Sequence, residues 1–165
     1  MYRAAFRGVY FAALALVAHA SSGYAMPPYM TMVYPVLGPQ KSSDYGVRRH
    51  PIKKIRQHHD GIDLAAPQGS QIRAIAEGQV IYSDPHGGYG KMIVVQHASG
   101  LTSHYGHCET LKVPIGAHVR AGDILGTVGS TGLSTGPHLH FEIRLNGAAT
   151  DPERYLPGLD SPSQG

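Results

Sequence analysis

Polar and apolar residues alternate without a break in the segment His138-Leu139-His140-Phe141-Glu142-Ile143-Arg144-Leu145. Successive side chains of a β-strand point to opposite faces, so this period of two predicts a strand with one apolar and one polar face. Two histidines separated by one residue then project from the same face. The segment therefore predicts a β-sheet fold and a place where two imidazoles lie side by side.

The rest of the chain has the same character. Short segments rich in β-branched and apolar residues are separated by turn clusters such as Asp84-Pro85-His86-Gly87-Gly88, and none shows a sustained helical pattern. Besides 138–145, we predict strands in the segments 71–83, 91–97, 101–107 and 118–128. Many short strands at regular spacing predict an all-β fold, an antiparallel sheet or sandwich with long loops.

The first 25 residues have the pattern of an export signal. Arg3 and Arg7 precede an apolar run at 9–18, and small residues offer cleavage after Ala20 or Ala25. That run is shorter than the roughly 20 residues of a membrane-spanning helix. We expect an exported chain, in the periplasm, cell wall or extracellular space, without a stable membrane anchor after cleavage; the alternative is a buried N-terminal helix. Residues 26–34 are expected to form a tether, 35–157 the folded domain and 158–165 a flexible tail.

The charge of the chain says little about its partners. Fourteen basic and 11 acidic residues give a net charge of +3, and removal of the two signal arginines leaves 12 against 11, or +1. One basic run remains, without interleaved aromatic residues, so no nucleic-acid partner is predicted. We expect this run to be a solvated loop; its alternative role is attraction to an anionic polymer. It consists of Arg48, Arg49, Lys53, Lys54 and Arg56.

A second cluster of metal-binding side chains lies upstream. His59 and Asp63 are four residues apart, so on a strand they share a face, with Gly61 between them leaving that face open. A helix would also align them, but Gly61 and a nearby proline disfavour one. With the histidine pair at 138 and 140, they offer four groups that can surround a divalent metal. Zinc accepts imidazole and carboxylate ligands, and catalytic zinc sites use three protein ligands.

Another histidine can reach this site from the segment 101–107. His104 and His107 are three apart, so at strand spacing they point to opposite faces and one of them can face the metal. The single cysteine, Cys108, follows His107. Because neighbours on a strand point to opposite faces, a Cys–His nucleophile pair is not expected, and we predict a buried thiol.

Three separated segments carry a further signal. They are His59-Asp60-Gly61-Ile62-Asp63, then Tyr105-Gly106-His107, and then Gly129-Ser130-Thr131-Gly132 followed by Gly136-Pro137-His138-Leu139-His140-Phe141. In this order they closely resemble the lysostaphin-type (LytM-like) zinc metallopeptidases, which cut bacterial peptidoglycan. The resemblance covers roughly residues 34–156, from Tyr45-Gly46-Val47-Arg48-Arg49-His50-Pro51 to Asp151-Pro152 and Tyr155-Leu156. It implies a barrel-sandwich-hybrid-like fold (a duplicated hybrid motif).

The resemblance also implies a site. One zinc ion per chain is bound by His59, Asp63 and His140, and the catalytic residues His138 and His107 flank its water. His138 is expected to take the proton of the water, and His107 to stabilise the oxyanion or share the proton transfer. The substrates are stem or cross-bridge peptides of peptidoglycan, cut by a monomeric endopeptidase. Cys108 departs from the family, which usually has a bulky aliphatic residue there.

Two other classes of protein are weighed against this one. Family members that have lost zinc ligands bind and activate other wall hydrolases, and retention of all five site residues argues against that role here. The segment 119–126 resembles the hairpin of biotinyl and lipoyl carrier domains, but no lysine lies between Arg120 and Arg144 to carry the group. The motifs leave open whether a glycine bridge or a D-amino-acid cross-link is cut.

Overall fold

The structure is a computed structural model that describes residues 32–49, 52 and 54–156. The proposed export signal, residues 26–31 of the tether, Lys53 and the tail 158–165 lie outside the described residues. The strands are β1 (Gln40–Ser43), β2 (Gly46–Arg49), β3 (Arg56–His59), β4 (Ile62–Ala65), β5 (Gln71–Arg73), β6 (Gly78–Pro85), β7 (Lys91–Gln96), β8 (Leu101–Leu111), β9 (His118–Val119), β10 (Ile124–Val128), β11 (His138–Leu145) and β12 (Ala148–Thr150).

Three single-turn 3-10 helices complete the structure: η1 (Gly87–Tyr89), η2 (Ala98–Gly100) and η3 (Pro152–Arg154). Within the described residues there is no α-helix, and no helix is long and apolar enough to cross a membrane. The strand pairs of the described chain are antiparallel. The predicted all-β antiparallel fold is confirmed.

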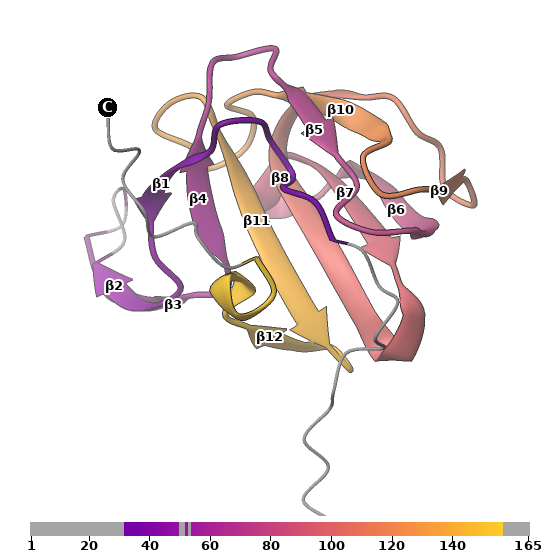
Figure 1. Cartoon of the computed structure of the whole chain (residues 1–165). Coiled ribbons are helices and arrows are strands. Elements are labelled where there is room, and N and C mark those ends of the chain that lie inside the picture. The colour runs from indigo at the N-terminus through magenta and orange to yellow at the C-terminus, as the bar shows by residue number, and fades with distance from the viewer. Residues whose placement is uncertain (1–31, 50–51, 53, 157–165) are drawn as a thin grey trace, which may run out of the picture.

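One large sheet dominates the molecule (Figure 1). Its main path runs β1-β4-β11-β8-β7-β6-β9, with the long strands β8 and β11 near its middle. The first half of β8 pairs with β11 and β7, whereas its second half pairs with β10, which in turn pairs with β5. β2 and β3 form a separate two-stranded hairpin at the side where β1 and β4 lie (Figure 1).

The apolar face of β11 lies in the core. Leu139, Phe141 and Ile143 are fully buried, and they share one hydrophobic cluster with Ile72 of β5 and Leu125 of β10. The β5–β10 pair therefore packs over the apolar face of the long strands, which gives the sandwich its second layer. Burial of each such side chain contributes about 1.5–3 kcal/mol. The polar face of β11 points the other way and carries the candidate site.

Two predicted strands are interrupted at matching places. The segment 71–83 divides into β5 and β6, and the segment 118–128 divides into β9 and β10. The two breaks face each other, because the amide of Ala74 donates to the carbonyl of Asp123 and the amide of Gly122 donates to the carbonyl of Ala74. The alternation of polar and apolar residues did not predict these two breaks, because they depend on hydrogen bonds between two distant segments.

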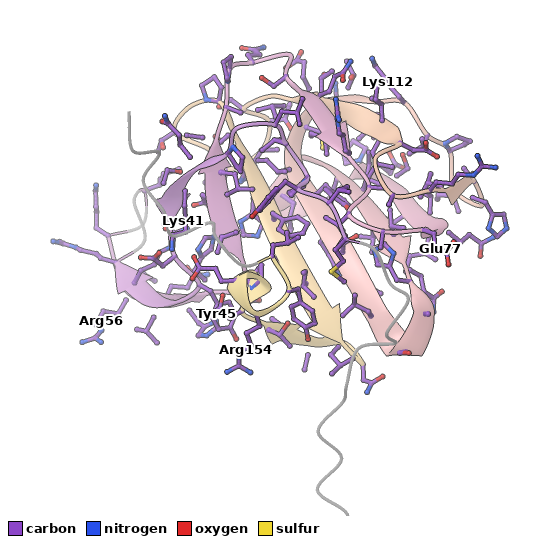
Figure 2. The ribbon with its side chains drawn as sticks, in the orientation of Figure 1. Lys41, Tyr45, Arg56, Glu77, Lys112 and Arg154 are labelled. Atoms are coloured by element: carbon purple, nitrogen blue, oxygen red, sulfur yellow. The ribbon has the colours of Figure 1, made fainter. Side chains whose placement is uncertain are left out.

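The basic run is a hairpin and not the loop that we expected. Arg48 and Arg49 lie in β2, and Arg56 lies in β3. Tyr45, which is labelled in Figure 2, precedes β2 and connects this part of the molecule to β12. Its hydroxyl donates to the carbonyl of Ala149, 3.2 Å away.

His59 and Asp63 do not lie on one continuous strand, contrary to expectation. β3 ends at His59, the chain turns at Asp60 and Gly61, and β4 begins at Ile62. A Cβ atom on Gly61 would lie 2.2 Å from the carbonyl oxygen of Phe141. Gly61 is therefore required for close approach to β11, and the two side chains meet across a turn between two sheets.

Candidate active site

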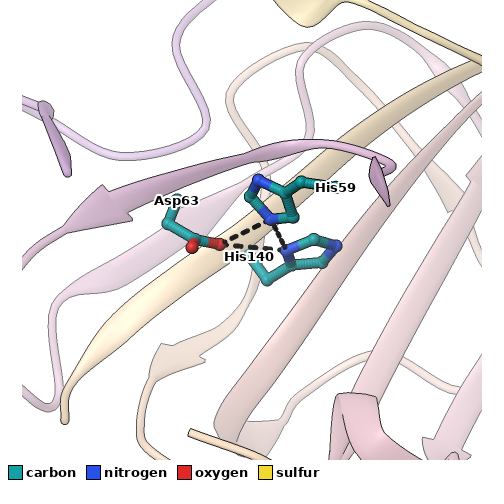
Figure 3. Close-up of side chains that lie close together, drawn as sticks. All are labelled: His59, Asp63 and His140. Atoms are coloured by element: carbon teal, nitrogen blue, oxygen red, sulfur yellow. Dashed lines mark hydrogen bonds and ion pairs between the residues drawn. The ribbon is translucent and has the colours of Figure 1, made fainter. Parts of the chain in front are cut away.

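Three potential metal-binding atoms converge on the polar face of β11 (Figure 3). His59 Nε2 is 3.0 Å from His140 Nδ1 and 3.1 Å from Asp63 Oδ1, and the last two atoms are 3.0 Å apart. Asp63 and His140 are direct cross-strand partners on β4 and β11. The hairpin that ends in β3 delivers His59. The relative exposures of the three residues are only 6–8%.

The spacing and chemistry of these atoms fit a divalent metal. Zinc forms bonds of about 2.0–2.2 Å to imidazole nitrogen and carboxylate oxygen, so the ligand atoms of a tetrahedral site lie about 3.3 Å apart. The observed separations of 3.0–3.1 Å need to open by only a few tenths of an ångström. The cluster can therefore hold a metal ion with three protein ligands and an open fourth position.

Hydrogen bonds on the outer side of both rings set their tautomers. His59 Nδ1 lies 2.7 Å from the carbonyl oxygen of Asp44, and His140 Nε2 lies 2.8 Å from Glu142 Oε1. Both partners are acceptors, so these two nitrogens carry the ring protons. The nitrogens that face the cluster, His59 Nε2 and His140 Nδ1, are then the positions at which a metal ion can take the place of a proton.

Glu142 also lines the cleft, and the sequence pattern alone did not single it out. It is fully buried, and its carboxylate accepts from His140, from the Tyr89 hydroxyl at 2.7 Å and from Arg144 Nε at 2.7 Å. Burial alone would raise the pKa of Glu142, but these hydrogen bonds and the charge of His140 lower it to about 2. The available signal was an acidic residue two positions after His140, on the same strand face.

The carboxylates around His140 favour positive charge at its ring. Burial works to lower the pKa of His140, yet hydrogen bonds and electrostatic attraction from Asp63 and Glu142 raise it to about 9. Burial likewise opposes ionisation of Asp63, but hydrogen bonds from His140 and His59 hold its pKa far below the usual range. A cation, whether a proton or a metal, is thus stabilised between these groups.

Two further histidines stand beside the cluster. The ring centroids of His107 and His138 are 4.6 Å apart, and His138 Nε2 lies 3.7 Å from Asp63 Oδ1. His107 Nδ1 donates to the carbonyl of Thr131, and His138 Nδ1 donates to the carbonyl of Gly136, each at 2.8 Å. Both Nε2 atoms are then proton acceptors. Burial lowers the pKa of His107 to about 4, against the effect of the Thr131 bond, so this ring is neutral at pH 7.

A β-bulge delivers His107 to the site. His107 has a left-handed φ of 60°, and the β7–β8 register shifts between the pairs Lys91–Cys108 and Ile93–Tyr105. Regular alternation would place His107 on the core face with Tyr105, but the bulge turns it outward. Such a backbone conformation costs roughly 1–3 kcal/mol in a residue that is not glycine, and strain of this kind concentrates at functional sites.

The positions of Cys108 and His104 on β8 can be compared with the sequence-based expectations. Cys108 occupies the core, fully buried, with its thiol donating to the carbonyl of Tyr105; burial raises its pKa to about 12. The predicted buried thiol is confirmed. The expectation that His104 and His107 point to opposite faces is wrong: His107 lines the cleft, and His104, opposite Glu142, lies on the same side of β8.

All five residues predicted for the site line one cleft: His59, Asp63, His107, His138 and His140. One wall of the cleft is the β2–β3 hairpin. The other is formed by the η1 turn with Tyr89 and by the loop that carries Leu133, Ser134 and Thr135. The amide of Leu133 donates to the carbonyl of Gly88, which joins the turn and the loop.

Comparison with known proteins finds relatives among peptidases and murein hydrolase activators. The chain is 43% identical over 120 residues to the DD-carboxypeptidase/endopeptidase Mpg of Neisseria meningitidis serogroup B, across 73% of this chain and 28% of that protein. It is 42% identical over 96 residues to the murein hydrolase activator EnvC of Escherichia coli (strain K12), across 58% of this chain and 23% of EnvC. The chain thus spans only about a quarter of the length of these relatives, which include both a peptidase and an activator.

Solved structures agree with this fold. A zinc-containing peptidase from Vibrio cholerae has a TM-score of 0.67 and 32% identity, over 72% of this chain and 37% of that one. The catalytic domain of lysostaphin from Staphylococcus simulans has a TM-score of 0.65 and 32% identity, over 74% of this chain and 93% of that domain. The model of peptidase family M23 matches residues 57–152, which hold both metal-ligand segments and the bulged strand. This chain belongs to peptidase family M23.

Proposed function

We propose that this protein is an exported, zinc-dependent endopeptidase that hydrolyses peptide bonds in the stem or cross-bridge peptides of peptidoglycan. The observation that carries the proposal is the cleft itself. Three metal-binding atoms 3.0–3.1 Å apart lie beside His107 and His138, whose proton-accepting nitrogens remain available. The peptidase relative Mpg and the zinc-containing Vibrio cholerae peptidase support the same activity and metal.

The chemistry divides between the metal and the chain. His59, Asp63 and His140 would hold a zinc ion, which would supply Lewis-acid activation of water and of the scissile carbonyl. His138 Nε2 accepts the proton of the attacking water and returns it to the leaving amine, because its Nδ1 proton is donated to the carbonyl of Gly136 and Nε2 is left with a lone pair. In this proposal His107 shares the proton transfer, which its neutral ring and its identical tautomer support. Glu142 keeps the ring of His140 oriented.

The similarity to EnvC favours one alternative, a protein that binds and activates another wall hydrolase. The two functions make different demands on the site. An activator has no need for lone pairs that converge within 3.1 Å or for a strained bulge that aims a histidine at them. The complete set of five residues therefore supports the peptidase.

Digestion of purified peptidoglycan tests the proposal. The zinc-loaded protein is incubated with sacculi, and the released muropeptides are identified by mass spectrometry. We expect newly freed amine and carboxyl termini with the wild-type chain and none with His140→Ala. A chain that binds zinc, releases no peptide products and stimulates a purified amidase would instead be an activator.

A further inference from the structure

An arginine lies at the edge of the candidate metal cluster. Arg48 is in β2, where Val47 on the opposite face is 63% exposed, while Arg48 faces the cleft and its side chain is 27% exposed. Its Nη2 atom donates to Asp63 Oδ2 at 3.2 Å. The other oxygen of Asp63 faces His59 and His140. A single carboxylate group therefore separates this guanidinium from the metal-binding atoms.

In the described part of the chain, Arg48 uses little of its hydrogen-bonding capacity. A guanidinium has five N–H donors in a planar fork that matches a carboxylate. Within residues 32–49, 52 and 54–156, the bond to Asp63 is the one hydrogen bond of the Arg48 side chain. Arg144, by contrast, is paired with Glu142 and lies 3.8 Å from Asp60. Arg48 therefore lines the cleft with N–H donors that no described residue accepts.

The charges at this end of the cleft favour an anion. Asp63 alone balances Arg48, and it is also a ligand of the divalent metal in the proposed site. With a metal bound, one carboxylate would lie between two cationic groups. The other two carboxylates that line the cleft, Asp60 and Glu142, lie against Arg144, so a local positive excess would remain at Arg48. A substrate anion that complements this charge would lie next to the candidate metal cluster, and therefore close to the bond that is cut.

The covalent structure of a peptide restricts which carboxylate can be there. The carboxyl group of the residue on the acyl side is consumed in the scissile bond. The residue that leaves as the amine has its own α-carboxyl carbon about 4 Å from the scissile carbon, within reach of a group next to the metal. That carboxylate is free when this residue is a chain terminus or is joined through its side chain. In an interior glycine bridge the same group is an amide.

Resting on the proposed peptidase function, we propose that Arg48 binds the free α-carboxylate of the leaving residue and so determines substrate specificity. The preferred substrates then end in a free carboxylate immediately after the cleaved bond, and interior glycine bridges are disfavoured. In the reaction, the oxygen of water bonds to the acyl carbon and the C–N bond breaks. One proton of the water passes to the leaving amine. The carboxylate held by Arg48 takes no part in bond changes, so Arg48 is a specificity-determining residue.

A binding experiment tests this without requiring turnover. Zinc-loaded His138→Ala protein is titrated with N-acetyl-D-alanyl-D-alanine and with its C-terminal amide, by calorimetry. We expect the carboxylate to bind on the order of 10-fold or more tightly than the amide, as a charge-assisted hydrogen bond to a half-buried arginine allows. Adding Arg48→Gln removes this preference, and Arg48→Lys keeps part of it.

Two controls separate the proposed role from a structural one. Arg49→Gln changes the adjacent arginine, which is exposed on the other face of β2 and bonds to the carbonyl of Lys54; it keeps the preference. The zinc content of every variant is measured, because Arg48 touches a metal ligand. If Arg48→Gln weakens both ligands equally, Arg48 acts only through Asp63. If the preference survives in Arg48→Gln, the metal alone binds the carboxylate.

The outcomes also distinguish this inference from the proposed function. A protein that digests peptidoglycan but shows no preference between acid and amide, or binds neither probe, overturns the role of Arg48 alone. An Arg48-dependent preference in a protein that never cleaves peptidoglycan overturns the peptidase and leaves the carboxylate site standing.

Discussion

Replacement of Glu142 by glutamine tests how the site is held together. The variant keeps the shape of the side chain and removes its charge. His140 can still donate to the amide oxygen, but the amide NH2 group then faces the Arg144 guanidinium, which donates to Glu142 in the native chain. One of these donors must lose its partner. The ring of His140 is consequently less firmly oriented and its metal-facing nitrogen is a weaker base.

The size of the effect follows from this position. Residues that hydrogen-bond to metal-ligating histidines typically change metal affinity by 10–100-fold when mutated. That range corresponds to about 1.4–2.8 kcal/mol. Glu142 is fully buried and also accepts from Tyr89, so we expect Glu142→Gln to fall inside this range and Glu142→Ala at or beyond its upper end.

Competition with a chromophoric zinc chelator at neutral pH measures the dissociation constant directly. Glu77→Gln is the matched control, because Glu77 is exposed and is not among the residues that line the cleft. Thermal unfolding with excess chelator shows whether each variant still folds. A folded Glu142→Gln protein with the zinc affinity of the Glu77→Gln control would show that Glu142 does not support the metal ligand His140.

The remaining predictions concern ligands, pH and packing. His140→Ala should lose zinc, whereas His138→Ala should keep zinc and lose activity by about 10²–10⁴-fold; full turnover in the second variant would show that His138 is not the base. In the zinc-free chain the pKa of His140 is raised to about 9, so the stability it contributes is complete below about 6.5 and lost as pH rises through 9. Denaturant melts of zinc-free protein between these pH values measure this loss, and a flat profile would contradict it. Zinc at 100 times its dissociation constant should stabilise the fold by about 2.7 kcal/mol, seen as a higher unfolding temperature that a chelator reverses. Gly61→Ala should destabilise the protein by about 1–3 kcal/mol or more, because its Cβ would overlap the carbonyl oxygen of Phe141; an unchanged melting curve would mean that β4 and β11 separate easily.

Local pattern was sufficient for the strand at the centre of the site. The alternation in 138–145 predicted β11 with its observed bounds, its apolar side in the core and two histidines on the other side. Side-chain direction along one strand depends only on backbone geometry, so a sequence states it directly. The motif resemblance then assembled the five site residues, which the structure places in one cleft.

Pairing between distant segments decided what the pattern did not contain. His59 and Asp63 lie on different strands joined by a turn, and Asp63 meets His140 because β4 and β11 pair in that register. The bulge at His107 reverses the local alternation, so spacing alone assigned His104 and His107 to the wrong relative faces.

Residue order along the chain was thus enough to predict the fold class, the central strand and the kinds of metal-binding side chain. The contacts of Glu142 with His140 and of Arg48 with Asp63 arise only when the strands are packed together. The physical reason is that periodicity is a property of one strand, whereas register, bulges and contacts across the cleft arise when several strands bury a common core.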